Sequence, residues 1–348
     1  MQSERLAQRQ SLRTVCLALL AMVSLGTTLL AQTGQYVSFD APGAGGGNNQ
    51  GTFPNSINSQ GWIGGTIILT TSVDQGFLRS PNGTYTVVIP AGAAQSTVSA
   101  INASHEAVGL AFYANGDTSG FLRDPSGNYT QLAVSGAYST TPSAINDNGM
   151  VAGFAFDSTG SHGFVWTAQR GFTVFDVPGS APGTTYLYGI NRAGAAVGSY
   201  TDSRYYSHGF LRSANGHFIT FEEIQRGTAT DAVAVNNQSQ IIGWANDGNG
   251  GTYGFVRNPG GASDTFGVAG AQGSAATAIN DDGVIVGWEF SDGGGDAGFE
   301  RDSAGNVSLI TLPFSNTASM ATGINAAGKV VGKYTDSNGA SHGWVGMP

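Results

Sequence analysis

The feature that most constrains this sequence is a unit that recurs along almost its whole length. Each unit carries an asparagine, a glycine seven residues later and then a glycine followed by an aromatic residue. The asparagines stand at intervals of 44 or 45 residues: Asn58, Asn102, Asn146, Asn191, Asn236, Asn280 and Asn325. Self-similarity at a fixed period in this range is typical of solenoids, arrays and propellers.

The stretch from Ser143 to Gly179 shows what one unit contains. Asn146 to Gly149 predicts a tight turn, because Asn and Gly adopt left-handed backbone angles at little cost. A second turn is expected at 157–160, followed by a third strand, another turn and a fourth strand that ends at Pro178. Four short antiparallel strands in a unit of this length match a propeller blade and exceed one coil of a β-helix.

The two ends of the chain predict how the units are joined. The last unit, after Asn325, ends before its fourth strand, whereas Gly34–Gly43 resembles the fourth strand at Arg170–Gly179. A ring gains from this offset because the first strand completes the last unit and removes both sheet edges. We therefore predict an all-β fold, a seven-bladed β-propeller of four-stranded antiparallel blades, closed by an N-terminal strand that completes the last blade.

Residues 1–31 are expected to precede this ring as a secretory signal peptide. Three arginines (Arg5, Arg9 and Arg13) stand before an apolar run from Val15 to Leu30, which is the order of charge and hydropathy in such peptides. Residues 32–348 then form a single domain of the secreted protein, extracellular or periplasmic, with no membrane insertion of the mature chain. The one cysteine, Cys16, lies in the removed segment, so disulfides and cysteine chemistry are excluded.

Charge argues against two classes of partner. The formal net charge is −9, and removal of three arginines and Glu4 takes away a net +2, which gives −11 for the mature chain. Such an acidic surface does not favour nucleic acid or anionic membranes as partners.

The glycine content does not indicate a collagen-like chain. Glycine, at 54 of 348 residues, has no collagen-like period, and the apolar content is sufficient for a packed core.

For the histidines, a structural role is favoured over a catalytic or metal-binding role. His105 replaces the glycine that five units have three residues after the asparagine, as Ser239 does in another unit, so it is expected to be a turn residue. His162, His208 and His342 precede the glycine–aromatic pair in three units and are expected to form hydrogen bonds rather than bind metal. No hydrolase elbow, metalloprotease, phosphate-loop or dinucleotide motif is present.

Aspartates recur between the second and third strands of five units: Asp157, Asp202, Asp247, Asp292 and Asp336. An aspartate there stabilises its turn by accepting backbone N–H bonds. Calcium binding at Asp292 and Asp296 is the alternative, because carboxylates on glycine-rich loops suit this ion. The run from Asp292 to Asp296, like the weaker candidate Asp247–Asn249, lacks the full spacing of a calcium loop, so no cofactor is the leading prediction.

Function is expected where a unit departs from the repeat. The fourth unit has aromatic and charged residues in two loops that should share one face, together with tyrosines at the start of its inner strand. Such residues stack on sugar rings or anchor a protein partner. The predicted ligand-binding residues are Tyr186, Tyr188, Arg204, Tyr205, Tyr206, Glu223 and Arg226. We interpret Arg204–Tyr206 as an insertion.

The repeated pattern resembles a known family. Ile324-Asn325 followed by Gly328, Val330-Val331-Gly332 and His342-Gly343-Trp344 is similar to the repeats of the bacterial HAF family of probable extracellular repeat proteins. The resemblance covers nearly all of residues 36–348. It implies an exported bacterial repeat protein and carries over no catalytic residue.

Together these features favour a secreted, non-enzymatic binding propeller that recognises an extracellular glycan or protein through loops on one face. Two alternatives remain open at this point. One is a secreted carbohydrate-active hydrolase or lyase, which would need acidic residues that converge across different loops. The other is a purely structural module of an envelope or matrix.

Overall fold

All regular structure in the described residues is β-strand. The computed structural model describes residues 36–224, 229–291, 295–314 and 318–347. The predicted signal peptide, residues 1–31, lies outside these ranges. Within them, the chain repeats a four-strand meander, in which each strand of a unit pairs with its neighbour in that unit.

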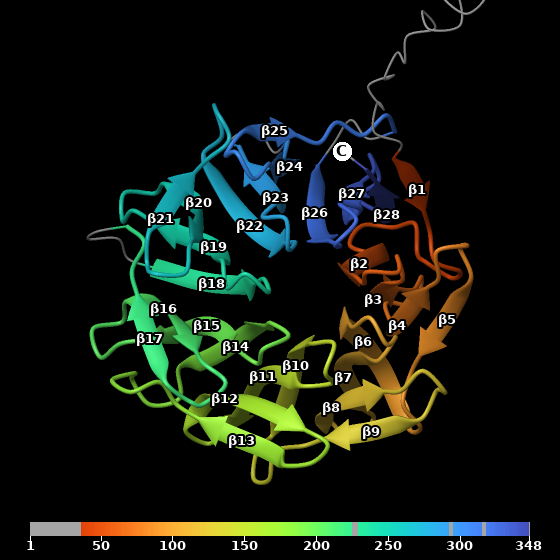
Figure 1. Ribbon diagram of the computed structural model, residues 1–348. Coiled ribbons are helices and arrows are strands. Elements are labelled where there is room, and N and C mark those ends of the chain that lie inside the picture. The colour runs from red at the N-terminus through yellow and green to blue at the C-terminus, as the bar shows by residue number, and fades with distance from the viewer. Residues whose placement is uncertain (1–35, 225–228, 292–294, 315–317, 348) are drawn as a thin grey trace, which may run out of the picture. The chain divides into compact units, whose positions relative to one another are not determined.

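The strands fall into groups of four that surround a central axis (Figure 1). The innermost strands are β2 (Gly51–Ile57), β6 (Ala93–Ile101), β10 (Ser139–Ile145), β14 (Thr185–Ile190), β18 (Ala229–Val235), β22 (Gly273–Ile279) and β26 (Ser319–Ile324). The second strands are β3 (Ile63–Ile68), β7 (Ala107–Tyr113), β11 (Val151–Asp157), β15 (Ala196–Thr201), β19 (Ile241–Asn246), β23 (Ile285–Phe290) and β27 (Val330–Thr335).

The third strands are β4 (Asp74–Arg79), β8 (Thr118–Arg123), β12 (Gly160–Thr167), β16 (Ser207–Arg212), β20 (Thr252–Arg257), β24 (Ala297–Arg301) and β28 (Ser341–Gly346). The outer strands are β1 (Val37–Phe39), β5 (Tyr85–Val88), β9 (Tyr129–Leu132), β13 (Gly171–Phe175), β17 (Phe218–Phe221), β21 (Ser263–Phe266) and β25 (Val307–Leu309). Each group of four strands is one unit. The units are numbered by the order of their innermost strands along the chain, so that the fourth unit contains β14 to β17.

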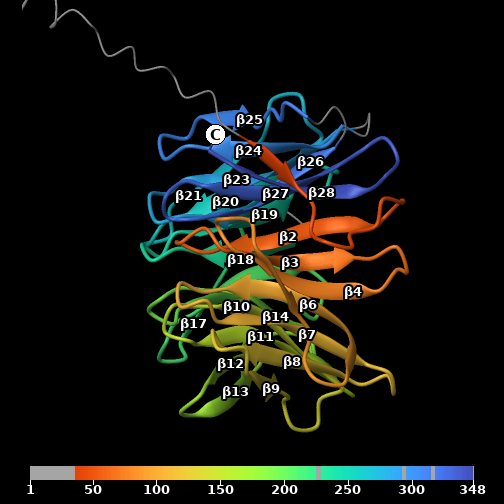
Figure 2. The ribbon, with the colours of Figure 1, turned by 90° about the vertical axis from the view of Figure 1, so that its right-hand side faces the viewer.

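Three of the units form separate four-stranded sheets, and two larger sheets each combine two units. Single parallel pairs, Gly51 with Ser341 and Thr252 with Gly273, join the units of the larger sheets. Within every unit the pairing is antiparallel, and the strands run along the axis with turns at both ends (Figure 2). The predicted all-β propeller architecture is therefore confirmed.

The turns define two opposite ends of the ring. We call the end with the turns that begin at the repeated asparagines the Asn face. The end with the turns between second and third strands, such as Asp202–Tyr206, is the Asp face. His105 has a φ angle of 63° and Gly149 one of 73°, so the prediction that His105 occupies a left-handed turn position is confirmed.

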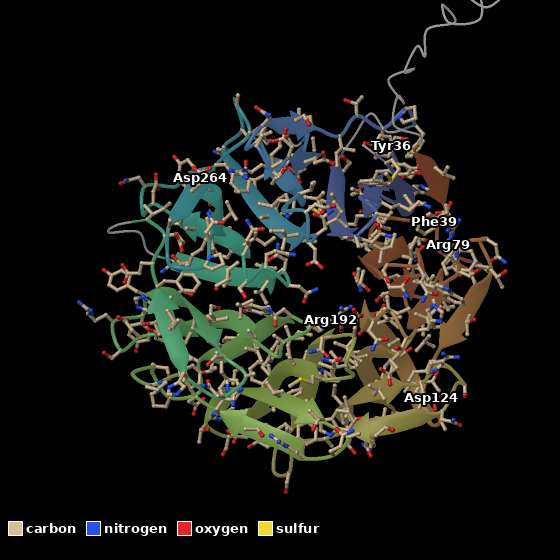
Figure 3. The ribbon with its side chains drawn as sticks, viewed as in Figure 1. Tyr36, Phe39, Arg79, Asp124, Arg192 and Asp264 are labelled. Carbon is tan, nitrogen blue, oxygen red and sulfur yellow. The ribbon has the colours of Figure 1, made fainter. Side chains whose placement is uncertain are left out.

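The first strand of the described chain pairs with the last. β1 is antiparallel to β28, with Val37 opposite Val345 and Phe39 opposite Gly343. β1 also contacts the first unit, because the guanidinium of Arg79 lies 4.6 Å from the centre of the Phe39 ring (Figure 3). The same contact recurs between other neighbouring units: Arg212 on Phe175, Arg257 on Phe221 and Arg301 on Phe266.

A closed cycle of hydrogen bonds joins the seven repeated asparagines. The side-chain Nδ2 of each donates to the backbone carbonyl of the next one, at 2.8–3.4 Å, and Asn325 donates to Asn58. The Oδ1 atom accepts backbone N–H groups of its own turn, as Asn146 does from Asn148 and Met150. Each asparagine thus stabilises its own turn and links it to the next unit.

The core is divided among the boundaries between neighbouring units. At one boundary Val197 and Phe221 of the fourth unit pack against Val235, Ile241 and Phe255 of the fifth. The glycine seven residues after each asparagine allows the inner strands to approach closely. A Cβ atom on Gly198, for example, would lie 1.9 Å from the carbonyl oxygen of Tyr186, so no larger residue fits there.

Candidate binding site

The predicted site centres on the Asp-face turn of the fourth unit, from Asp202 to Tyr206. The backbone N–H of Asp202 donates to the carbonyl of Tyr206 at 2.9 Å, and Tyr205 donates to the carbonyl of Asp202 at 3.0 Å. Asp202 Oδ1 accepts the N–H groups of Arg204 and Tyr206. The hydrogen bond from the backbone N–H of Tyr206 is the main reason why the pKa of Asp202 is lowered. This carboxylate is therefore ionised at neutral pH.

The interpretation of Arg204–Tyr206 as an insertion is wrong. The turn from Asp336 to Ala340 in the last unit has the same length and the same hydrogen bonds, including those to the aspartate Oδ1. Arg204–Tyr206 therefore replaces Asn338–Ala340 within a conserved turn geometry. What distinguishes the fourth unit is the chemistry of its turn and not the length.

Tyr205 is an aromatic residue in a position that suits glycine. Its φ angle is 69°, and the equivalent Gly339 has 81°. A bulky side chain in the left-handed region is uncommon because Cβ approaches the following carbonyl. Tyr205 is also 88% exposed, and Tyr206 beside it is 43% exposed. The ring of Tyr205 is therefore displayed to solvent at a cost in backbone energy.

A polar network connects this turn to the inner strand of the same unit. Ser207, directly after the turn, donates to Asp231 of β18 at 3.3 Å. Asp231 also bonds to Ser199, which bonds to Tyr188. Burial raises the pKa of Asp231, against the effect of its two serine partners. Burial likewise raises the pKa of Tyr188 to about 12.

An aromatic cluster extends the site toward the third unit. Tyr186 and Tyr188 stack on each other with ring centres 6.4 Å apart, since alternate residues of a strand point to the same face of the sheet. The register of β14 shifts at Tyr188. Phe154 of β11 packs edge-on against Tyr186 at 5.2 Å, and the partly exposed Phe156 lies 6.1 Å from Tyr186. The departure of the fourth unit from the repeat indicated the two tyrosines, but both phenylalanines and Asp231 were missed.

One predicted contact residue, Glu223, does not join this surface. The side chain of Glu223 is fully buried and pairs with Arg257 at 3.2 Å, and Arg257 in turn lies over Phe221. Glu223 was predicted from its loop position, but its carboxylate compensates a guanidinium between two units and is not exposed to a ligand. Arg226 lies outside the described residues.

The three repeated histidines form hydrogen bonds with acids of their own unit, as predicted. His208 lies 3.3 Å from Asp202 and 3.0 Å from Glu222, with Tyr200 stacked on its ring. His162 contacts Asp157 and Asp176, and His342 contacts Asp336 and Asp40 of the N-terminal segment. Each histidine therefore ties an Asp-face turn to an outer strand.

The repeated aspartates act as turn acceptors wherever they are described. Asp157, Asp202, Asp247 and Asp336 each accept the backbone N–H two residues on. Asp292, one of the two predicted calcium ligands, lies outside the described residues, and Asp296 alone does not test the site. Within the ranges that the structure describes, no group of three or more His, Cys, Asp or Glu side chains is placed to hold a metal ion.

The described part of the chain also contains no helix that is long and apolar enough to cross a membrane.

Comparison with known proteins supports the fold. No family model and no curated protein sequence matches this chain. Its structure is similar to virginiamycin B lyase from Staphylococcus aureus, with a TM-score of 0.61 and 12% identity, over 90% of this chain and 100% of the lyase. It is similar to the β-propeller domain of the Trilobed protease from Pyrococcus furiosus, with a TM-score of 0.59 and 9% identity, over 84% and 95% of the two chains.

A lectin, BP39L from Burkholderia pseudomallei, is similar over 83% of this chain and 93% of its own, with a TM-score of 0.55 and 13% identity. These proteins differ in activity, and such low identities carry the fold alone. The class to which residues 36–348 belong is therefore the β-propellers.

Proposed function

We propose that this protein is a secreted, non-enzymatic binding propeller that recognises an extracellular glycan or protein through the Asp face of its fourth unit. The contact surface consists of Arg204, Tyr205 and Tyr206 of the turn, together with Tyr186 and Tyr188 of β14. The observation that carries the proposal is Tyr205, which displays an aromatic ring from a backbone conformation that favours glycine.

The backbone of Tyr205 is strained, and packing of its ring does not offset that strain. Left-handed angles cost roughly 1–2 kcal/mol for a residue with a Cβ atom, and an 88% exposed ring regains little of this by packing. Strained residues that packing does not explain cluster at binding sites. Tyrosine and arginine are also the residue types that dominate recognition surfaces. Arg204, 79% exposed, stands beside this ring and supplies a charged donor.

The proposal includes the finer architecture and the location. We infer seven blades, the last completed by β1, because β1 pairs with β28 and contacts Arg79 as outer strands of other units contact theirs. The cycle of seven asparagine hydrogen bonds is consistent with this count. Export rests on the sequence of residues 1–31, and membership of the HAF family rests on the repeat motif.

The experiment that tests this function exchanges one turn for another. The variant Arg204→Asn, Tyr205→Gly, Tyr206→Ala gives the fourth unit the Asn-Gly-Ala sequence of the last unit, whose turn has the same hydrogen bonds. The mature parent is first screened on a glycan array and by pull-down from extracellular material. We expect the exchanged variant to lose at least ~30-fold in affinity for the partner found, because a central aromatic or arginine anchor contributes about 2 kcal/mol or more.

The matched control is Tyr138→Ala, which removes another exposed tyrosine of the Asp face, in the third unit. It should bind like the parent. The exchanged variant should unfold at the same temperature as the parent or higher, since glycine relieves the left-handed strain. A partner that binds the exchanged variant as tightly as the parent would move the site away from this turn.

One observation favours the enzymatic alternative, a carbohydrate-active hydrolase or lyase. Asp231 is a largely buried carboxyl with a raised pKa, held by two serines next to Tyr188, and such perturbed acids occur at catalytic sites. If incubation with polysaccharides releases shorter fragments, Asp231→Asn should abolish that release without loss of folding. If the parent releases none, the binding function is retained.

A further inference from the structure

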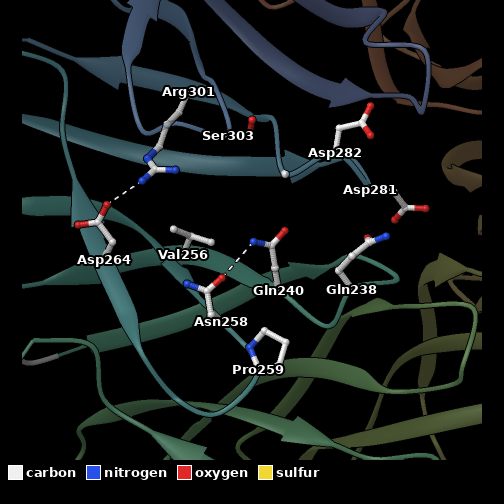
Figure 4. A pocket seen from close by; sticks show the side chains of 11 residues that line it. Gln238, Gln240, Val256, Asn258, Pro259, Asp264, Asp281, Asp282, Arg301 and Ser303 are labelled. Atoms are coloured by element: carbon white, nitrogen blue, oxygen red, sulfur yellow. Dashed lines mark hydrogen bonds and ion pairs between the residues drawn. The ribbon is translucent and has the colours of Figure 1, made fainter.

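The Asn face carries a second type of feature, a groove between neighbouring units that occurs at equivalent places in the ring. One lies between the fifth and sixth units and has a volume of about 630 Å³ (Figure 4). Another lies between the second and third units and has a volume of about 330 Å³. Both are formed by two successive asparagine turns and the third strands behind them, and both contain a proline of the outer turn, Pro259 or Pro125.

The groove between the fifth and sixth units is lined by polar groups that bind one another. Arg301 pairs with Asp264 at 2.7 Å, and Gln240 donates to Asn258 at 3.0 Å (Figure 4). Its remaining lining is mainly amide and carboxylate, with Asp282 at one side. Because Arg301, Asp264, Gln240 and Asn258 bind one another and no aromatic residue lines the wall, this groove does not select a ligand class.

The groove between the second and third units differs at two equivalent positions. Trp166 stands where the other groove has Arg301, and Glu106 stands where it has Gln240. Trp166 packs with one side on the core beside Phe172 and is partly exposed, and its indole N–H has no hydrogen-bond partner among the described residues. The groove thus has an aromatic wall with a free donor.

The carboxylate of Glu106 lies opposite, between the two turns. One oxygen, Oε2, accepts Nδ2 of Asn102 at 2.7 Å, which leaves Oε1 free to accept. The carboxylate extends across to the next unit, because a Cβ atom on Gly149 would lie 3.4 Å from Oε2. Gln169 adds an amide at the rim that is not bonded to any described residue. Acceptor and donor groups therefore line the same groove as the indole.

We propose that this groove binds one neutral pyranose ring of a carbohydrate. The C–H face of such a ring is apolar and stacks on an indole, while its hydroxyls need both acceptors and donors at the edge. A carboxylate is a strong acceptor for hydroxyls, and it disfavours acidic sugars by charge repulsion. The volume lies at the lower end of the ~300–1,000 Å³ range of small-molecule sites, which suits a single ring. This site is independent of the proposed Asp-face surface.

The test uses the mature protein and four methyl pyranosides, those of glucose, galactose, mannose and N-acetylglucosamine. Saturation-transfer NMR and the change in tryptophan fluorescence give the dissociation constants. We expect at least one glycoside to bind with a dissociation constant on the order of 1 mM, as befits a ligand of this size. Methyl glucuronoside should bind more weakly than methyl glucoside.

Variants assign the binding to the groove. Trp166→Leu and Glu106→Gln should each weaken binding roughly tenfold, whereas Asn258→Ala in the other groove should leave it unchanged. Because Trp166 also contacts the core, each variant is checked by thermal unfolding. If Trp166→Leu does not fold, Glu106→Gln and Gln169→Ala decide.

The proposal is overturned if none of the glycosides binds, or if the Trp166 and Glu106 variants bind as the parent does. The turn-exchanged variant of the fourth unit separates the two faces. Glycoside binding that survives this exchange and is lost in Glu106→Gln supports the groove whatever happens to the Asp-face function. Binding lost only in the exchanged variant places the sugar on the Asp face and overturns the groove.

Discussion

At the scale of single residues, the repeated asparagine combines two bonds that only an amide of its length supplies. Oδ1 caps the turn of its own unit, and Nδ2 donates to the carbonyl of the next unit. Aspartate would keep the first bond and lose the second, while glutamine would be one methylene too long. The side chain is therefore used both as a turn former and as a link between units.

Replacement of Asn146 by Asp tests this double role. The change keeps an acceptor for the turn but removes the donor to Asn191, 2.8 Å away, and leaves a buried carbonyl unpaired next to a carboxylate. We expect a loss of about 1–3 kcal/mol in the free energy of unfolding by urea. The control is Asn82→Asp, at an exposed turn where the described contacts use Oδ1 alone. Equal losses in the two variants would contradict the link between units.

Local turn positions of single residues could be predicted from the sequence, whereas contacts between units could not. His105 could be placed in a left-handed turn, because five of the other units have glycine at that position and the constraint is local. The partner of each asparagine could not be predicted, since it lies one unit away and depends on how the inner strands meet at the axis. The same holds for Glu223, whose loop position suggested exposure although Arg257 of the next unit buries it.

At the scale of elements, the Asp-face turns are connected to outer strands by the histidines. His162 bridges Asp157, at the end of β11, and Asp176, just after β13. Burial alone would lower the pKa of His162, but the hydrogen bonds and charges of Asp176 and Asp157 outweigh it, so the pKa is raised. Hydrogen bonds from Thr159 hold the pKa of Asp157 at about 2, so Asp157 remains charged.

This bridge predicts a pH dependence of stability. Because the folded-state pKa of His162 exceeds the unfolded value of about 6.5, its contribution is complete below that value and is lost as the pH rises through the folded pKa. The difference in melting temperature between the parent and His162→Gln should therefore be larger at about pH 5.5 than at about pH 8.5. His217→Gln, in a turn outside this pattern, is the control. A difference that does not change with pH would exclude the charged bridge.

The unusual residues of the turn at Asp202 explain why Arg204–Tyr206 was wrongly predicted to be an insertion. Residues 202–206 differ in sequence from every other Asp-face turn, and this difference suggested extra residues. The hydrogen bonds to Asp202 instead show the same four-bond turn as at Asp336, with side chains exchanged. A non-glycine residue at φ 69° is what hid the equivalence, because turn prediction relies on glycine at that position.

At the scale of the whole molecule, the period and strand content were sufficient to predict a propeller. Each unit is too small to bury both faces of its sheet, so its apolar residues require neighbours on either side. The core clusters at the unit boundaries meet that requirement, and one of them contains Phe39 with Phe77 and Val345. The N-terminal segment therefore takes part in the packing between the last and first units.

That segment makes several kinds of contact besides the pairing with β28. Ser38 bonds to the hydroxyl of Tyr334 at 2.9 Å, and Tyr36 packs edge-on against Trp344 at 5.5 Å. Asp40 accepts from His342. These contacts reach residues about 300 positions away in sequence, so they close a long loop, and their removal exposes the edge of β28.

The central claim is that β1 closes the ring, and a strand-deletion experiment with thermal unfolding tests it most directly. A mature chain that begins at Ala44 lacks β1 and its contacts with the first and last units. We predict a loss of several kcal/mol or aggregation, and recovery of the melting temperature when a synthetic peptide of residues 32–43 is added, but not a scrambled one. A truncated chain that melts cooperatively within a few degrees of the parent, and does not respond to the peptide, would contradict the closure.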